Sequence, residues 1–476
     1  MLDVLIEGGE VIDGSGAPRQ RADVAIEGGR IAAIGALQGR AARRRIDAEG
    51  QIVAPGFIDC HTHDDALLLE HPLPHPKLAQ GVTTVIAGNC GVSLAPLVTD
   101  DPPPPLDLMG RERFRHARFA DYLAALRAAQ PVLNAAALVG HTTLRIGHVA
   151  DLSRAATAAE TARMQAALAE ALDAGAIGLS TGVYYPPARA ATTEELIAVA
   201  EPLRDGRGLI TMHIRDEADA IDDALREALA VGRAVNAPLV LSHHKLMGRS
   251  NHGRSVETLA LIEAAARQQS VCFDCYPYVA SSTMLLPARV AQSADVRITW
   301  SRAEPAAAGR SLLAMAAERG VDPVALAERL QPAGAIYFAM SDEDVDRILA
   351  HPLAMIGSDG LPHDAVPHPR LWGSFPRVLG HYVRERRVLA LEAAVHKMTG
   401  LTARRFGLAA RGELRPGWAA DVTVFDAARV IDGASFDEPT TLPQGIRQVL
   451  VNGQLALDGG RWTDARAGQV LRRTAA

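Results

Sequence analysis

Short apolar segments alternate with helical stretches along the middle of this 476-residue chain, and this alternation restricts the fold more than any other feature. We predict eight strands, at Ile52–Asp59, Val82–Ala87, Ala135–Gly140, Ala176–Thr181, Leu209–His213, Leu239–His243, Val271–Tyr276 and Leu353–Asp359. Between several of them, as in Asp216–Val235, apolar residues recur with a helical period. Strands that alternate with helices indicate a parallel sheet, and eight such units predict an α/β fold of the (β/α)8 barrel type.

The two ends of the chain have a different pattern, with short strands punctuated by Gly-rich turns and an Asn452-Gly453 hairpin signal. We therefore expect residues 1–54 and 405–476 to form one small β-sandwich domain beside a barrel of residues 55–404. Residues 281–344 separate the last two predicted barrel strands by more than one helix needs. This segment is interpreted as an insertion over the barrel mouth, acting as a lid.

Composition excludes several classes of protein. A formal net charge of −6 offers no electrostatic basis for binding nucleic acid or a membrane surface. The chain has no run of about 18 apolar residues, and its first residues lack the features of a signal peptide. Four cysteines in a chain of this length are not a disulfide scaffold. We expect a cytoplasmic protein with a small-molecule partner; the sequence leaves the oligomeric state open.

A His-x-His motif follows the first predicted strand. Side chains alternate along a strand, so His61 and His63 point the same way and can clamp a metal ion. The alternative for this motif alone is a solvated loop that happens to hold two histidines.

Further polar residues follow other predicted strands at the same end. Cys90 follows the second strand, and His213 and His243 end the fifth and sixth strands. Cys90 alone would more often be an inert buried thiol, but two histidines facing the same mouth make a metal site the better interpretation. Asp359 ends the eighth strand, where a carboxylate can take a proton from an activated water and return it to a leaving nitrogen.

The strand-end motifs resemble the amidohydrolase superfamily. The segments that resemble its D-aminoacylase branch are Gly88-Asn-Cys-Gly91, His213-Ile-Arg-Asp-Glu-Ala-Asp219, Ser242-His-His-Lys245 and Gly357-Ser-Asp-Gly-Leu-Pro362. The resemblance implies zinc-dependent hydrolysis of N-acyl-D-amino acids to a carboxylic acid and a free D-amino acid. It also implies that Cys90, His213 and His243 bind one Zn²⁺ tightly, that His61 and His63 form a second, weaker or vacant position, and that Asp359 is the catalytic acid/base.

The distribution of lysine excludes a related mechanism. Hydantoinases and dihydroorotases of the same superfamily bridge two metals with a carbamylated lysine from the fourth strand. This chain has no lysine between Lys77 and Lys245, so Cys90 is the available anionic ligand. Cyclic-amide opening is therefore disfavoured, and a non-catalytic scaffold is disfavoured because the ligands and Asp359 are all present.

The resemblance extends to substrate-binding residues. It assigns Lys245, Tyr276 and Arg370 to the substrate α-carboxylate, although Tyr276 could be a packed strand aromatic and Arg370 a surface residue. Val296-Arg297-Ile-Thr-Trp-Ser301 resembles N-acyl-D-glutamate deacylases, in which the matching arginine pairs with the γ-carboxylate. If Arg297 faces solvent instead, the pocket is apolar and the preferred D-amino acids are hydrophobic.

The other cysteines are interpreted as structural. Cys272 and Cys275 form a C-x-x-C motif inside a predicted strand, where residues three apart face opposite sides. Cys60 lies between the two histidines of the His-x-His motif and is expected to point away from them.

Overall fold

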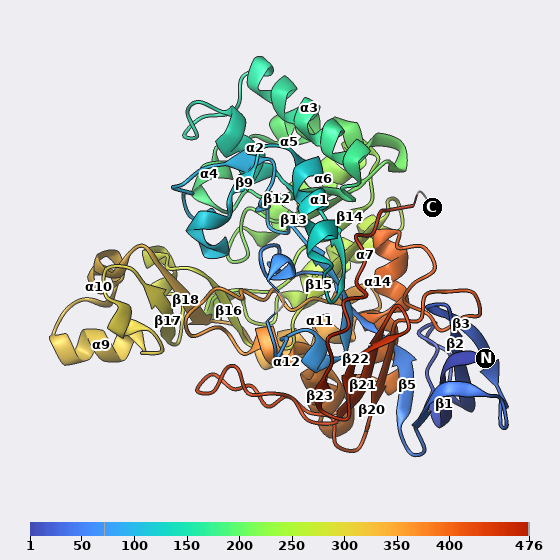
Figure 1. Cartoon of the computed structure of the whole chain (residues 1–476). Helices are drawn as coiled ribbons and strands as arrows, with labels where there is room; N and C mark the ends of the chain where they lie inside the picture. The colour runs from blue at the N-terminus through green and yellow to red at the C-terminus, as the bar shows by residue number, and fades with distance from the viewer. Residues whose placement is uncertain (71, 475–476) are drawn as a thin grey trace.

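Strands from both ends of the chain pair in one mixed nine-stranded sheet (Figure 1). Residues 1–70 and 72–474 are described by the structure, a computed structural model. The N-terminal strands are β1 (Leu2–Val11), β2 (Gln20–Glu27), β3 (Arg30–Gly35), β4 (Ala42–Asp47) and β5 (Ile52–Pro55). The C-terminal strands are β20 (Val422–Phe425), β21 (Ile446–Val451), β22 (Gln454–Asp458) and β23 (Arg461–Trp462). The two sets meet where β5 pairs antiparallel with β20.

Eight strand positions along the middle of the chain pair in parallel, each with the next along the sequence. They are β6 (Phe57–Asp59), β7 (Val82–Ala87), β10 (Asn134–Ala137) with β11 (Val139–Gly140), β12 (Gly178–Gly182), β13 (Leu209–His213), β14 (Leu239–Leu241), β15 (Val271–Cys275) and β19 (Ala354–Ile356). Hydrogen bonds also join the last position to the first, from the Asp359 amide to His61 O at 2.7 Å and from the His63 amide to Gly360 O at 3.1 Å.

The first predicted strand, Ile52–Asp59, is wrong as a single element. It divides at Gly56 into β5, which joins the sheet of the chain ends, and β6, which joins the parallel strands. A Cβ at Gly56 would lie 2.2 Å from the side chain of Thr83, so only glycine permits this close approach. An apolar run alone does not show that its two halves belong to different sheets.

Helices separate most of the parallel strands and cover them. The longer ones are α1 (Phe119–Ala129), α2 (His141–His148), α3 (Ala158–Ala174), α5 (Thr193–Ala200), α6 (Ile221–Val235), α7 (Ser255–Ala266), α11 (Asp342–Ala350), α12 (Arg370–Arg377), α13 (Leu391–Met398) and α14 (Gly400–Phe406). Short elements are α4 (Pro186–Arg189), η1 (Leu67–Leu69), η2 (Leu78–Gln80), η3 (Leu106–Met109), η4 (Arg111–Arg113), η5 (Glu201–Gly206), η6 (Arg249–Asn251), the π-helix η8 (Val378–Glu385), and the paired strands β8 (Leu97–Val98) and β9 (Arg115–His116). In the described ranges no helix has both the length and the apolar character of a membrane span.

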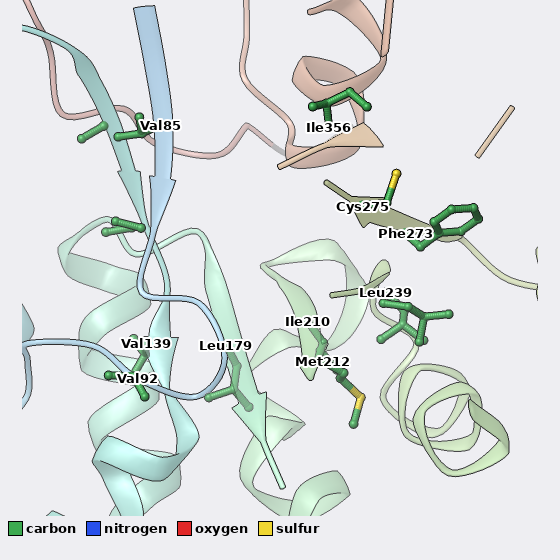
Figure 2. Packing of buried hydrophobic residues seen from close by; sticks show 14 of the residues in the cluster. Val85, Val92, Val139, Leu179, Ile210, Met212, Leu239, Phe273, Cys275 and Ile356 are labelled. Carbon is green, nitrogen blue, oxygen red and sulfur yellow. The ribbon is translucent and has the colours of Figure 1, made fainter. Parts of the chain in front are cut away.

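Neighbouring residues on these strands pack into different hydrophobic clusters, as the alternation of side chains requires. Figure 2 shows Val85, Leu179, Ile210, Leu239 and Ile356 in the larger cluster. Other strand residues belong to a second cluster, among them Ile86, Leu209, Val240 and Met355. Cys275 lies in the first cluster and Cys272 in the second, so the C-x-x-C motif does face opposite sides.

Residues between β15 and β19 form a separate small unit. It contains β16 (Ala280–Met284), α8 (Pro287–Val290), β17 (Val296–Ser301), η7 (Pro305–Ala307), α9 (Leu312–Arg319), α10 (Pro323–Leu330) and β18 (Ala333–Phe338). The strands form an antiparallel sheet with a hydrophobic cluster of its own, and the unit extends to the left in Figure 1. Residues after 341 already belong to α11, which packs against α7 and β19.

Candidate metal centre

Cys90, His213 and His243 come together from three separate strands. Cys90 follows β7, His213 ends β13 and His243 follows β14, so the carboxyl ends of parallel strands bring them to one edge. The Cys90 Sγ lies 3.3 Å from the His243 Nε2, which lies 3.0 Å from the His213 Nδ1. All three residues are buried.

The spacing of these atoms fits a tetrahedral zinc ion. One ligand atom from each residue lies within 4.8 Å of the others. Bonds of about 2.0–2.3 Å to Zn²⁺ place tetrahedral ligand atoms about 3.3–3.8 Å apart. A thiolate with two imidazoles is also a donor set that zinc favours. The group can therefore hold one Zn²⁺ and leave a fourth position for substrate or water.

A second group shares the same sulfur. His61 and His63 follow β6, and Asp359 follows β19. The His61 Nε2 lies 3.2 Å from the Cys90 Sγ, and ligand atoms of His61, His63, Cys90 and Asp359 all lie within 4.8 Å of one another. Asp359 contacts both imidazoles, at 3.2 Å to the His63 Nε2 and 3.5 Å to the His61 Nε2. A second metal position is thus available beside the first.

The backbone is strained where these side chains enter the site. Cys90, His243 and Asp359 have φ angles of 54°, 38° and 49°, a region that residues other than glycine rarely adopt. Such a conformation costs about 1–3 kcal/mol per residue and persists where the surrounding structure enforces it. At Cys90 the surroundings are tight, because a Cβ on Gly182 would lie 2.0 Å from the Cys90 carbonyl oxygen.

Charged neighbours set the ionisation of the group. Burial alone would raise the pKa of the Cys90 thiol, but the His61 and His243 imidazoles outweigh it and hold this pKa well below its usual value. Burial likewise opposes ionisation of Asp359, while the Arg370 guanidinium and the hydrogen bond with His63 hold its pKa well below the usual range. The site therefore favours a thiolate and a carboxylate, the forms that bind metal and accept protons.

Two buried carboxylates that sequence analysis missed orient the histidines. Asp274 on β15 accepts a hydrogen bond from the His243 amide at 2.9 Å and faces the His61 Nδ1 at 3.3 Å. Glu217 lies 3.1 Å from the His243 Nδ1. Carboxylates in this position fix the tautomer and ring orientation of a metal-binding histidine. The one sequence signal is Glu217 standing four residues after His213.

Lys245 and Arg370, assigned above to the substrate α-carboxylate, both lie near the ring of Tyr276. The Lys245 Nζ lies 5.7 Å from the centre of the Tyr276 ring, and the Arg370 guanidinium carbon lies 4.7 Å from the same ring centre. Arg370 is a buried residue that pairs with Asp359 at 2.9 Å and donates to Ser282 O at 3.0 Å. Its Nε has no hydrogen-bond partner among the described residues. The surface alternative for Arg370 is therefore wrong.

Arg297 is not brought to this cluster. It lies on β17, where its Nη1 donates to Phe436 O at 2.5 Å and to Asp437 Oδ1 at 2.8 Å. Sequence analysis did not single out Arg289, which is buried on α8 and pairs with Glu217 at 3.0 Å. Its guanidinium stacks 4.5 Å from the ring centre of Tyr184. Of the two arginines, Arg289 is the one connected to the histidine group through Glu217.

Two cavities open next to the histidines and differ in chemistry. The charged cavity has a volume of about 440 Å³ and is lined by Tyr184, Arg189, Arg215, Asp216, Glu217, Ala218, Asp219, Met247, Ala288, Arg289 and Gln292. The apolar cavity is lined by His63, Cys90, Val92, Pro105, Leu108, Met109, Tyr185, Ser282, Thr283, Asp359 and Leu361. Its volume is only about 20 Å³, which is room for about one water-sized group.

Comparison with known proteins identifies relatives along the whole chain. A model of the amidohydrolase family matches residues 44–247 and 289–456. A D-aminoacylase of Alcaligenes xylosoxydans xylosoxydans is 54% identical over 476 residues, covering 100% of this chain and 98% of that protein. An N-acyl-D-glutamate deacylase of the same organism is 52% identical, covering 100% and 97%.

A solved structure gives the same picture. The crystal structure of N-acyl-D-glutamate deacylase from Bordetella bronchiseptica, complexed with zinc and a phosphonate inhibitor that mimics the tetrahedral intermediate, matches with a TM-score of 0.96. It is 51% identical, and the match covers 99% of each chain. The similarity therefore includes the β-rich ends and the unit between β15 and β19.

Proposed function

This chain belongs to the amidohydrolase family, and from that premise we propose that it hydrolyses N-acyl-D-amino acids to a carboxylic acid and a free D-amino acid. The observation that carries the proposal is the meeting of Cys90, His213 and His243 beside Asp359. The D-aminoacylase and the N-acyl-D-glutamate deacylase, each more than half identical along the full length, support the substrate class.

In this proposal Cys90, His213 and His243 hold one Zn²⁺ tightly, and His61 and His63 with the shared Cys90 form a weaker or vacant second position. When bound, the ion would supply Lewis acidity, which polarises an acyl carbonyl and lowers the pKa of water. Asp359 accepts the proton from the attacking water and later gives it to the leaving nitrogen. The contact between Asp359 and the His63 Nε2 holds this carboxylate beside the proposed metal positions.

The substrate α-carboxylate binds Arg370, Lys245 and Tyr276. Arg370 offers a buried guanidinium whose Nε has no hydrogen-bond partner in the described part of the chain, and such a group gains most from a carboxylate ligand. Lys245 adds a second positive charge across the Tyr276 ring. These groups hold the amide in a fixed orientation relative to Asp359, which Arg370 already contacts.

An acidic side chain, as in N-acyl-D-glutamate, is the favoured substrate. Three arginines, Arg189, Arg215 and Arg289, line the charged cavity together with Asp216, Glu217 and Asp219. Arg289 pairs with Glu217, which contacts the His243 ring. Arg297 stays the residue that sequence similarity proposes for binding the substrate γ-carboxylate. In this proposal the substrate replaces residues 436–437, which Arg297 binds in the structure. The competing candidate is a deacylase for D-amino acids with hydrophobic side chains.

We also propose how the domains of the chain are arranged around this site. The eight parallel strands form a closed (β/α)8 barrel over residues 55–404, residues 1–54 and 405–476 form a β-sandwich domain, and the insertion at 281–344 acts as a lid. Support comes from the hydrogen bonds that join β19 to the residues after β6. All four cysteines are free, which suits a reducing cytoplasm, and no nucleic-acid or membrane partner is proposed.

A substrate panel tests the function. The zinc-loaded enzyme is assayed on N-acetyl-D-Glu, -D-Asp, -D-Met and -D-Leu, with N-acetyl-L-Glu as the control. We expect the highest kcat/KM on N-acetyl-D-Glu and no turnover of the L-isomer. Turnover of none of the D-substrates would refute the proposal, and a preference for D-Leu would select the hydrophobic alternative.

A further inference from the structure

The apolar cavity has a different composition from the charged cavity. Apolar side chains make one wall, from Val92, Pro105, Leu108, Met109 and Leu361, and all five residues are buried. The opposite wall holds His63, Cys90 and Asp359 of the candidate metal centre. Neither lysine nor arginine lines this cavity; Arg370 lies behind its wall, where it contacts Asp359 and Ser282 O. The cavity suits an uncharged apolar group attached directly to the reacting carbonyl.

Two adjacent tyrosines separate the cavities at one metal ligand. Tyr184 lines the charged cavity and Tyr185 lines the apolar cavity. Their rings are perpendicular and meet edge to face, with centres 5.5 Å apart. Both contact the His213 ring, with centres 5.2 Å and 5.0 Å from it. The Tyr185 hydroxyl is held by Thr283 at 3.0 Å. The centre therefore has a charged side and an apolar side, with His213 between them.

We propose that Val92, Leu108 and Met109 form the acyl-chain pocket of this enzyme and restrict it to short acyl groups such as formyl and acetyl. The inference rests on the proposed hydrolysis of N-acyl-D-amino acids and adds the chemical class of the acyl group. The amino-acid part of the substrate carries one or two carboxylates and lies toward the charged side. The acyl chain, the one uncharged end, extends into the apolar side.

The position of Leu108 and Met109 explains how the pocket is closed. Both lie on η3, within the loop that β8 and β9 join at its base. The Thr99 amide donates to Phe114 O at 3.1 Å and fixes the two ends of this loop. Leu106 of the same short helix lies in the main hydrophobic core, as Met109 does, but does not line the apolar cavity. η3 therefore presents Leu108 and Met109 to the cavity and turns Leu106 away from it.

The available space sets the expected length of the acyl chain. A cavity of about 20 Å³ accepts the methyl of an acetyl group, but not the four further carbons of a hexanoyl group. The walls are well packed, since Met109 is 1% exposed and Val92 3% exposed. Longer chains would have to displace these side chains, and overpacking of this kind is unfavourable.

The test compares acyl length in wild type and in two enlarging variants. Zinc-loaded enzyme is assayed on N-formyl-, N-acetyl-, N-butyryl- and N-hexanoyl-D-glutamate. We expect wild type to prefer the acetyl over the hexanoyl substrate at least about tenfold in kcat/KM, and Met109→Ala and Leu108→Ala to shift that ratio toward the longer chains about tenfold or more. Leu106→Ala, on the same helix, is the matched control and should leave the ratio unchanged.

A narrowing variant and a binding measurement complete the test. Val92→Leu should lower turnover of the acetyl substrate relative to the formyl one. In the Asp359→Asn background, calorimetry should show that Met109→Ala tightens binding of the hexanoyl substrate but not of the acetyl one. Equal turnover of acetyl and hexanoyl substrates by wild type, or a ratio unchanged in both enlarging variants, would overturn the acyl pocket alone. Failure of every N-acyl-D-amino acid would overturn the proposed function with it.

Discussion

Two histidine groups meet at the Cys90 sulfur but differ in their other partners. The His213 ring contacts two tyrosine rings, and His243 faces Glu217 at 3.1 Å. On the other side, His61 and His63 both contact Asp359, at 3.5 Å and 3.2 Å, and His61 also faces Asp274. The first pair is oriented by carboxylates that do not take part in the proposed reaction. The carboxylate that contacts both members of the second pair, Asp359, is itself the proposed acid/base.

This difference is the physical basis for the proposal that the two positions bind metal with unequal strength. A metal bound to His61 and His63 competes with the contacts that these imidazoles make with Asp359, and binding requires neutral imidazole. A metal bound to His213 and His243 leaves Asp359 free for proton transfer. The two groups therefore differ in whether a bound ion would compete with the proposed acid/base.

Removing the shared sulfur should have the largest effect. We expect Cys90→Ala to lose bound zinc and activity together, because this side chain belongs to both groups. His63→Ala, the matched variant on the other side, should keep one zinc per chain. Metal content by mass spectrometry and kcat/KM measure the two variants in parallel. Equal zinc loss in both would end the distinction between the two positions.

Asp359→Asn should rank next and affect chemistry without affecting metal retention. An amide cannot accept the proton from water, so kcat should fall by about 10²–10⁴-fold. Zinc content should stay at the wild-type level because the proposed tight position does not use Asp359. Near-wild-type turnover in this variant would contradict the acid/base assignment.

The charged side of the centre predicts a smaller, substrate-dependent effect. Loss of a hydrogen bond to a charged group costs about 1.5–3 kcal/mol, so Arg289→Leu should lower kcat/KM for N-acetyl-D-Glu about ten- to hundredfold and spare N-acetyl-D-Leu. Arg297→Leu is the comparison, since its guanidinium binds the 436–437 segment. A selective loss in Arg297→Leu alone would return the specificity role to Arg297.

The smallest effect is expected far from the centre, at the start of α3. Thr157 and Glu160 form a capping box there, with the Glu160 amide donating to the Thr157 Oγ1 at 3.3 Å. Thr157→Ala should lower the free energy of unfolding by about 1 kcal/mol and leave kcat/KM unchanged. Denaturant unfolding and a routine assay check both parts; a change in kcat/KM would link this helix to the site.

Strand-end residues could be found from sequence because they obey local rules. The alternation of side chains predicted the common direction of His61 and His63, and the ends of parallel strands must meet at one edge. The opposite faces of Cys272 and Cys275 followed from the same rule and are confirmed. Cys60 is also confirmed to point away from the ligand groups, since its Sγ lies 3.1 Å from Ile356 O.

Features that depend on packing between distant segments could not be found in this way. Gly56 divides an apolar run because of Thr83, and Arg297 is held by a segment about 140 residues further along the chain. Arg289 and Asp274 carry no motif; their importance lies in what surrounds them. The helix predicted at 216–235 begins only at Ile221, because the preceding residues contribute Glu217 to the His213 and His243 group.

Anomalous diffraction at the zinc edge, on crystals of the zinc-loaded enzyme, tests the central claim most directly. The account predicts an ion bonded to the Cys90 sulfur at about 2.3 Å and to His213 and His243 nitrogens at about 2.0–2.1 Å. It also predicts that Asp359 lies beside the ion and remains available for proton transfer. A zinc peak away from Cys90, or the absence of any peak between these three residues, would contradict it.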